Sequence, residues 1–325
     1  MESFSKTLDG YTGSFVAKRR RKRLSILLAI VAVLTVAGIV VARLSSGGYF
    51  DVGSGKAVPK SAVLERWQAR DWDGVLASCA ASLATKPLDP FYLGFKGLAS
   101  FYKGLELPEG EERAALMDES VVNIRKALVP EGRAARGLPR AELEYVLGKA
   151  YYQKGSAYLD GAVKWLEASI ANGYVGSDSR EYLAVAYAGL GQSEAAVRNF
   201  EAALQRRRSD FLLVAAAKAY MAANRPDRAE SLLLEALSAS QDALAREKCR
   251  FGLADLYEAR GDDSRAAEQL EFALKDDSMS AEAHYRLGLL AQKRGDNLAA
   301  RASWRRAVAI DPMHMPSRQK LAEKL

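Results

Sequence analysis

The stretch AEAHYRLGLLAQKRGDNLAARASWRRAVAIDP, residues 281–312, holds two apolar-periodic segments separated by a turn at Gly295. In the second segment, the small residue Ala300 is followed four positions later by Trp304 and three positions after that by Ala307. These offsets place all three side chains on one face of a helix. Small residues let a second helix approach that face closely, and the large residue fills the space beside them. The stretch therefore predicts a helical hairpin.

The same pattern returns along the chain at a spacing close to 34 residues. Each copy has a small residue, a large apolar residue four positions later and a small residue three positions after that. One hairpin cannot bury its apolar face alone, so a row of hairpins predicts a helical stack that is stabilised by neighbouring units. The second-helix segments are SVVNIRKAL (120–128), AVKWLEASI (162–170), AVRNFEAAL (196–204), AESLLLEAL (229–237), AAEQLEFAL (266–274) and AARASWRRAV (299–308).

This pattern resembles the tetratricopeptide repeat (TPR). In the unit that begins at Ala281, the pair Leu287 and Gly288 stands where the family expects a large and a small residue. Ala291 departs from the family, which usually has an aromatic residue there. The resemblance implies an all-α TPR helical-hairpin solenoid, a right-handed superhelix with a concave inner surface. About six units are expected in residues 90–315, and they begin near Pro90, Ala141, Ser177, Asp210, Glu247 and Ala281.

Two segments flank these units. Residues 59–89 have two helical halves but few motif matches, and we interpret them as a degenerate helical hairpin. Residues 316–325 predict a polar capping helix, which the end of a solenoid requires. Within the array, the unit at Pro90 carries extra residues around 105–115, and Asn224 stands where another unit would have its turn glycine.

An uncharged apolar stretch, LSILLAIVAVLTVAGIVVA, occupies residues 24–42. At about 1.5 Å of rise per residue it is long enough to span a hydrocarbon core of roughly 30 Å. The basic run KRRRKR (18–23) precedes it. The positive-inside rule then predicts a basic cytoplasmic tail (1–23) and a transmembrane helix (24–43), with the rest of the chain across the membrane. A signal peptide cleaved after Ala42 is the alternative, but the apolar stretch is longer than the core of a typical signal.

The Gly/Ser-rich residues 44–58 predict a flexible linker. They include GSGK (53–56), which is superficially similar to a phosphate-binding loop. The glycine spacing of such a loop is absent, and Ala57 stands in place of its serine or threonine. We therefore interpret this segment as linker only.

The composition excludes several classes of protein. With 49% hydrophobic and 27% charged residues, the 325-residue chain has globular rather than disordered composition. Its net charge of +7 comes almost entirely from residues 1–43, which hold eight basic and two acidic side chains. The remainder is nearly neutral, whereas a nucleic-acid-binding domain normally presents a basic face to phosphates. We therefore expect no nucleic-acid partner.

Catalytic, metal and cofactor sites are not expected either. The two cysteines, Cys79 and Cys249, lie 170 residues apart and are not expected to form a disulfide framework or a four-ligand zinc site. The only two histidines, His284 and His314, do not favour metal catalysis or a His-based triad. No Ser/His/Asp set is present, so the chain is predicted not to be an enzyme. Cys79 and Cys249 fall in predicted helices and are expected to be buried thiols, and His284 is expected to pack between helices.

The resemblance also implies where partners would bind. In TPR proteins, the first helix of each unit lines the inner surface, and the corresponding positions here are rich in aromatic and charged residues. Exposed aromatic residues favour protein or peptide partners, although neighbouring helices or residues 105–115 would cover them in the alternative interpretation. The candidate groove residues are Phe91, Phe101, Tyr102, Tyr145, Lys149, Tyr152, Phe211, Lys218, Phe251, Asp255 and Tyr285.

These features together predict a scaffold of the bacterial inner membrane, tethered through residues 24–43, with the TPR part in the periplasm. Such a protein would help to assemble an envelope complex, such as a secretion, flagellar or pilus machine. A chaperone-like module that binds unfolded segments is the alternative, and a regulator acting through residues 1–23 is a third. The run Arg206–Arg208 suits the C-terminal end of a helix dipole, or it contacts an anionic lipid or a partner.

Overall fold

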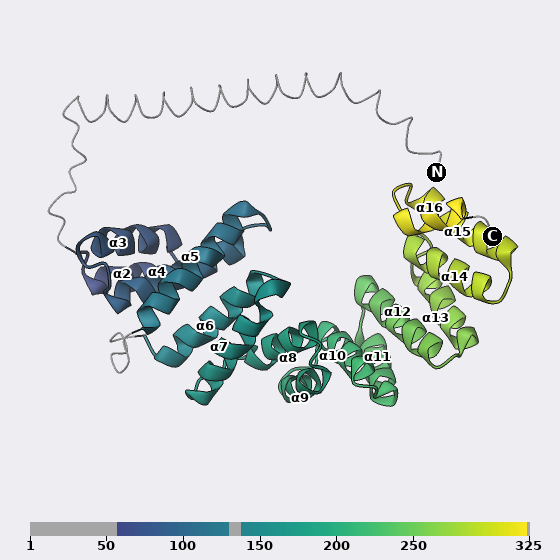
Figure 1. The fold of residues 1–325 in the computed structure, drawn as a ribbon, viewed down its shortest axis with the longest axis horizontal. Coiled ribbons are helices and arrows are strands. Elements are labelled where there is room, and N and C mark those ends of the chain that lie inside the picture. The colour runs from purple at the N-terminus through teal and green to yellow at the C-terminus, as the bar shows by residue number, and fades with distance from the viewer. Residues whose placement is uncertain (1–56, 130–137, 324–325) are drawn as a thin grey trace, which may run out of the picture. The chain divides into compact units, whose positions relative to one another are not determined.

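The computed structural model describes residues 57–129 and 138–323, and in them the chain is entirely helical (Figure 1). The predicted all-α architecture of stacked helical hairpins is confirmed. The described helices begin with α2 (Lys60–Gln68) and α3 (Trp72–Thr85), and they end with α16 (Met315–Ala322). A short 3-10 helix, Ser156–Tyr158, lies in one of the turns.

Six hairpins lie between these flanking helices. We call the first helix of each hairpin an A helix and the second a B helix. The A helices are α4 (Pro90–Glu106), α6 (Arg140–Gln153), α8 (Ser179–Gly189), α10 (Asp210–Ala222), α12 (Ala243–Ala259) and α14 (Ala281–Lys293). The B helices are α5 (Glu111–Leu128), α7 (Leu159–Ala171), α9 (Ser193–Leu204), α11 (Pro226–Ala239), α13 (Asp263–Asp276) and α15 (Asn297–Ile310).

The hairpins stack in chain order. Each A helix packs against its own B helix, and each B helix packs against the next A helix. Successive A helices from α4 to α12 also touch one another. Their shared surface, which we call the A-helix face, is therefore continuous from α4 to α12, and side chains from different units can meet on it.

Small residues at the helix crossings produce this close packing. A Cβ atom at Gly148 on α6 would lie 2.6 Å from Cγ of Leu166 and 2.9 Å from its backbone nitrogen on α7. Only glycine allows the two helices to cross at this separation. In the last hairpin Ala300, Trp304 and Ala307 are all completely buried, as their spacing predicts.

The turn inside a hairpin uses a left-handed backbone conformation. Gly191, Gly261 and Gly295 have φ values of 72°, 76° and 81°. Asn224 occupies the equivalent place with φ of 57°. Asparagine tolerates this region better than most residues, so the departure from glycine in the sequence leaves the turn unchanged.

The N-terminal hairpin α2–α3 packs against the first A helix. The Tyr92 hydroxyl on α4 donates to the carbonyl oxygen of Val58 at 2.5 Å, and the Val58 amide donates to Ser82 Oγ at 3.0 Å. These two bonds hold the start of the described chain against α3 and α4. The extra residues around 105–115 lengthen α4 and α5, which are joined by a short turn between Glu106 and Glu111.

The predicted cytoplasmic tail (1–23), the transmembrane helix (24–43) and nearly all of the linker (44–58) lie outside the described residues. Among the helices that the structure does describe, none combines the length and the apolar character needed to cross a bilayer.

Candidate partner-binding site

A cavity of about 1020 Å³ opens on the A-helix face between α6, α8 and α10. Its volume lies at the upper end of the roughly 300–1,000 Å³ that is typical of ligand pockets. Its apolar lining comes from three consecutive A helices and from α9, and comprises Tyr152, Tyr182, Val185, Phe200, Phe211, Leu212 and Ala215. Two of the predicted groove residues, Tyr152 and Phe211, are among them.

Charged side chains surround the opening. Arg206 and Arg207 follow the end of α9 and line the cavity together with Asp178 and Glu181 at the start of α8. The guanidinium of Arg207 pairs with Glu181 at 2.6 Å. Phe211 is 59% exposed, which is unusual for a large apolar side chain. The cavity therefore offers apolar and charged contacts side by side.

Lys149 on α6 is the centre of a polar cluster beside this cavity. Its Nζ atom lies 2.8 Å from Oδ2 of Asp178 and 3.1 Å from the hydroxyl of Tyr145, which itself donates to Asp178. The ammonium also lies over the ring of Tyr182 at 4.7 Å from its centroid. The Lys149 side chain is only 12% exposed, so this pair is largely shielded from water.

The position of Asp178 is notable because it is the residue that precedes α8. Asp is a favoured helix N-cap, yet this carboxylate accepts no capping bond from its own helix. It reaches back to Lys149 and Tyr145 on the preceding A helix instead. The cluster therefore ties two consecutive units together across the A-helix face.

Burial raises the pKa of several weakly acidic side chains of the protein. Burial, followed by the hydrogen bond to Asp178, raises the pKa of Tyr145 above its ordinary value. Burial also raises the pKa of the Cys79 thiol to about 12 and that of Cys249 to about 11. Both thiols are completely buried, as predicted, so neither is presented to a reagent or a partner.

These shifts predict that the protein loses stability at alkaline pH. In the unfolded chain the Tyr145 phenol releases its proton near pH 10, and the Cys79 and Cys249 thiols release theirs near pH 8.5. The folded chain retains all three protons to higher pH. Below about pH 8.5 these groups therefore contribute no pH dependence to the free energy of unfolding. Above that pH the free energy of unfolding falls as the pH rises, by up to ~1.4 kcal/mol per pH unit for each group. Urea unfolding between pH 8 and pH 10.5 should show this decline, and Tyr145→Phe should make it shallower. Parallel pH profiles for the two proteins would contradict the assignment.

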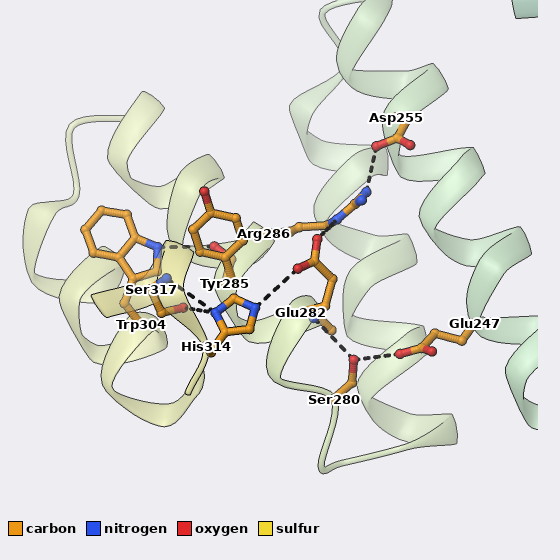
Figure 2. Close-up of polar contacts among 10 residues, drawn as sticks. Glu247, Asp255, Ser280, Glu282, Tyr285, Arg286, Trp304, His314 and Ser317 are labelled. Carbon is orange, nitrogen blue, oxygen red and sulfur yellow. Dashed lines mark hydrogen bonds and ion pairs between the residues drawn. The ribbon is translucent and has the colours of Figure 1, made fainter. Parts of the chain in front are cut away.

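A second network joins the last two A helices (Figure 2). Arg286 on α14 pairs with Asp255 on α12 at 2.6 Å and with Glu282 at 2.6 Å, and its guanidinium lies 4.7 Å from the ring centroid of Phe251. Glu282 in turn lies 3.4 Å from Nε2 of His314. The predicted groove residues Phe251 and Asp255 are therefore held by contacts within the chain.

His314 has a structural role at the end of the solenoid. Its Nδ1 atom accepts from the backbone amide of Ser317, so it caps α16 (Figure 2). Its ring lies 5.4 Å from that of Tyr285, which half-buries this predicted groove residue. His284 is buried as predicted, and burial lowers its pKa. Within the described residues no three His, Cys, Asp or Glu side chains gather as a metal site would require.

The interpretation of Phe91 and Phe101 as groove residues needs correction. Each is 1% exposed, and both belong to the core that also contains Val63 of α2 and Val75 of α3. The N-terminal hairpin and α6 enclose α4, so the face that other A helices expose is covered here. Tyr102 is partly covered as well, because its ring stacks on Trp72 at 5.5 Å between centroids.

The remaining candidates divide between cluster and surface. Tyr145 and Lys149 contribute to the polar cluster with Asp178, whereas Lys218 is exposed on α10. Sequence reasoning did not select Tyr182, which touches both the cluster and the cavity. The sequence does show that Tyr182 is an aromatic residue next to a groove position. An aromatic residue that packs between helices would show the same pattern, so the sequence alone does not identify it.

Comparison with known proteins agrees with this geometry. The family model described as tetratricopeptide repeat matches residues 281–314, the hairpin that contains Trp304. Residues 281–314 therefore form a tetratricopeptide repeat. No curated protein matches the chain in sequence.

Two solved structures of TPR proteins are similar to this chain. The C-terminal part of a TPR repeat-containing protein from Cytophaga hutchinsonii is similar with a TM-score of 0.58 and 13% identity, over 82% of this chain and 100% of that one. A tetratricopeptide repeat protein from Parabacteroides merdae is similar with a TM-score of 0.48 and 14% identity, over 80% of this chain and 94% of that one. At these identities the likeness concerns the fold alone.

Proposed function

We propose that this TPR protein is a membrane-tethered scaffold that binds a partner protein or peptide at the cavity on its A-helix face. The observation that carries the proposal is the exposed ring of Phe211 at the edge of a cavity of about 1020 Å³. An aromatic side chain at the rim of a mixed apolar and charged cavity is typical of the anchor points of protein interfaces. TPR arrays use such extended faces for binding.

Tethering rests on the sequence of residues 24–43 and on the basic run before it. The proposal places the protein in a bacterial inner membrane, with the solenoid in the periplasm, where it helps to assemble an envelope complex. Val58 is bonded to α3 and α4, so a tether would join the solenoid at that edge.

A topology test addresses the tether. Alkaline phosphatase fused after Leu325 should be active, and a fluorescent protein that matures only in the cytoplasm should stay dark at the same position. Active phosphatase together with a dark reporter is the expected result. A bright reporter with inactive phosphatase would place the solenoid in the cytoplasm and reject the proposed location.

A cross-linking test addresses the cavity. A photoreactive phenylalanine at position 211 should cross-link one stoichiometric partner in cells, and adding Tyr152→Ala should weaken that capture. The matched control position is Leu298, which is 83% exposed but lies on the B helix α15. We expect Tyr152→Ala to weaken partner affinity roughly thirtyfold, because loss of an anchor residue costs on the order of 2 kcal/mol. Equal yields at the two positions would reject the site.

The apolar lining also favours one second candidate, a chaperone-like module for unfolded segments. Tyr152, Val185 and Phe200 would contact apolar peptides of many sequences. The cross-linking pattern separates the two functions, since a scaffold gives one product and a chaperone gives many.

A further inference from the structure

We infer that the segment bound at the cavity is acidic, with carboxylates placed next to a large apolar side chain. This inference rests on the proposed function, because it names the chemistry of the partner at the same site. We draw it because, among the described residues, the acidic side chains lining the cavity form ion pairs within the chain, whereas some nearby cations do not.

The two acidic side chains that line the cavity are already neutralised. Asp178 is engaged by Lys149 at 2.8 Å and by the hydroxyl of Tyr145. Glu181 is engaged by Arg207 at 2.6 Å. Neither carboxylate is therefore available to attract a basic ligand, and each pair leaves no net charge on the wall.

Two cations near the cavity, Arg206 and Lys248, are not paired with a carboxylate of the described residues. Among the residues that the structure describes, Arg206 and Lys248 form no ion pair within 4.0 Å. Arg206 lines the cavity, and the Lys248 ammonium lies 5.0 Å from the ring centroid of Phe211. Lys218 also lies on α10, seven residues after Phe211 and hence on the same helical face. Among the described residues near the exposed ring, three cations, Arg206, Lys218 and Lys248, thus form no ion pair, against one acidic residue, Asp210, that also forms none.

Cations of the last A helix, α14, are arranged differently. Arg286 is held by Asp255 and Glu282, and Lys293 pairs with Asp263 at 2.6 Å. Cations without an ion pair, as near the cavity, are therefore not found on every A helix. A carboxylate delivered to the cavity would pair with Arg206 or Lys248 without breaking an existing ion pair.

The apolar part of the site specifies the rest of the ligand. Phe211 on α10 and Tyr182 on α8 line the cavity, together with Phe200, which is 1% exposed. A large apolar side chain inserted between them would cover Phe211, and flanking carboxylates would reach the two cations. A peptide segment with a large apolar residue flanked by acidic residues meets both requirements.

A pair of synthetic peptides tests the inference. The first is a fluorescent hexapeptide with a central Phe-Leu pair flanked by two glutamates on each side, and the second has glutamines in place of the glutamates. Binding to the full-length chain in an uncharged detergent is measured by anisotropy. We expect the acidic peptide to bind roughly tenfold more tightly, and its affinity to fall as salt is raised.

Charge-reversal variants assign the effect to the site. Arg206→Glu combined with Lys248→Glu should weaken binding of the acidic peptide about tenfold. The control, Arg305→Glu with Arg306→Glu, changes the same charge on exposed positions of α15 and should leave binding unchanged. Far-ultraviolet circular dichroism should be the same for all of these proteins.

The outcomes separate this inference from the proposed function. Equal affinity for the two peptides, or no binding of the acidic peptide at roughly millimolar concentration, would overturn the inference. If cross-linking at position 211 still captures a partner in that case, the proposed site stands and only the acidic chemistry fails. Equal loss of acidic-peptide binding in the control variant would also overturn it, because the attraction would then come from net charge alone.

Discussion

Replacing Trp304 by alanine is expected to lower the free energy of unfolding of the last hairpin by about 3–5 kcal/mol. Trp304 is completely buried, and its indole nitrogen donates to the carbonyl oxygen of Tyr285 at 3.2 Å. The ring lies so close to Gly288 that a Cβ atom there would be 2.2 Å from the indole nitrogen. Gly288 has no side chain that could fill the space that the indole leaves.

The loss should be local. Each unit of a solenoid contacts only its neighbours, so the end of the array can unfold while the rest remains folded. Hydrogen exchange should accelerate in α14, α15 and α16 and stay unchanged in α4 to α8. Trp304→Phe is the control, since it keeps most of the apolar volume and should lose less stability. Protection that falls evenly along the whole chain would contradict this account.

Replacing Asp178 by alanine is expected to cost about 2–3 kcal/mol of stability, somewhat less than for a fully buried pair. The substitution leaves the Lys149 ammonium, which is 12% exposed, without a carboxylate. It also removes the acceptor of the Tyr145 hydroxyl bond. Because these residues join consecutive units, the contact between α6 and α8 should weaken most.

A double-mutant cycle measures this interaction. Adding Lys149→Met to Asp178→Ala removes the uncompensated charge, so the double variant should recover at least half of the lost stability. The matched control is Glu235→Ala, which breaks the exposed pair between Arg208 and Glu235 and should cost less than about 1 kcal/mol. Strictly additive losses in the cycle would show that Lys149 and Asp178 do not stabilise each other.

The hairpins themselves were predictable from short-range patterns. The spacing of Ala300, Trp304 and Ala307 describes one helical face, and Gly295 marks the turn before it. Both features involve residues less than two helical turns apart. Their consequences, a buried stripe and a left-handed turn, depend on local geometry and so appear in the sequence directly.

The candidate site was predictable only in part. The TPR resemblance assigns groove residues by their position in the first helix of each unit, and it placed Phe91 and Phe101 on the open face of an A helix. That assignment does not take into account a hairpin that precedes the first unit. In the structure, that hairpin and α6 enclose α4. The same assignment treated Tyr145 and Lys149 as separate contacts for a partner, whereas the structure joins them through Asp178.

The sequence by itself determined the helical period, the turns and the residues that pack inside each hairpin, because these depend on neighbours a few positions apart. Only the tertiary structure decided which aromatic rings are covered and which charges are already paired. Those properties depend on how one hairpin is placed against the next, where a shift of a few ångströms makes or breaks an ion pair. Phe211 and Arg206 are accessible at the cavity for this reason, whereas Phe91 and Lys149 are occupied within the chain.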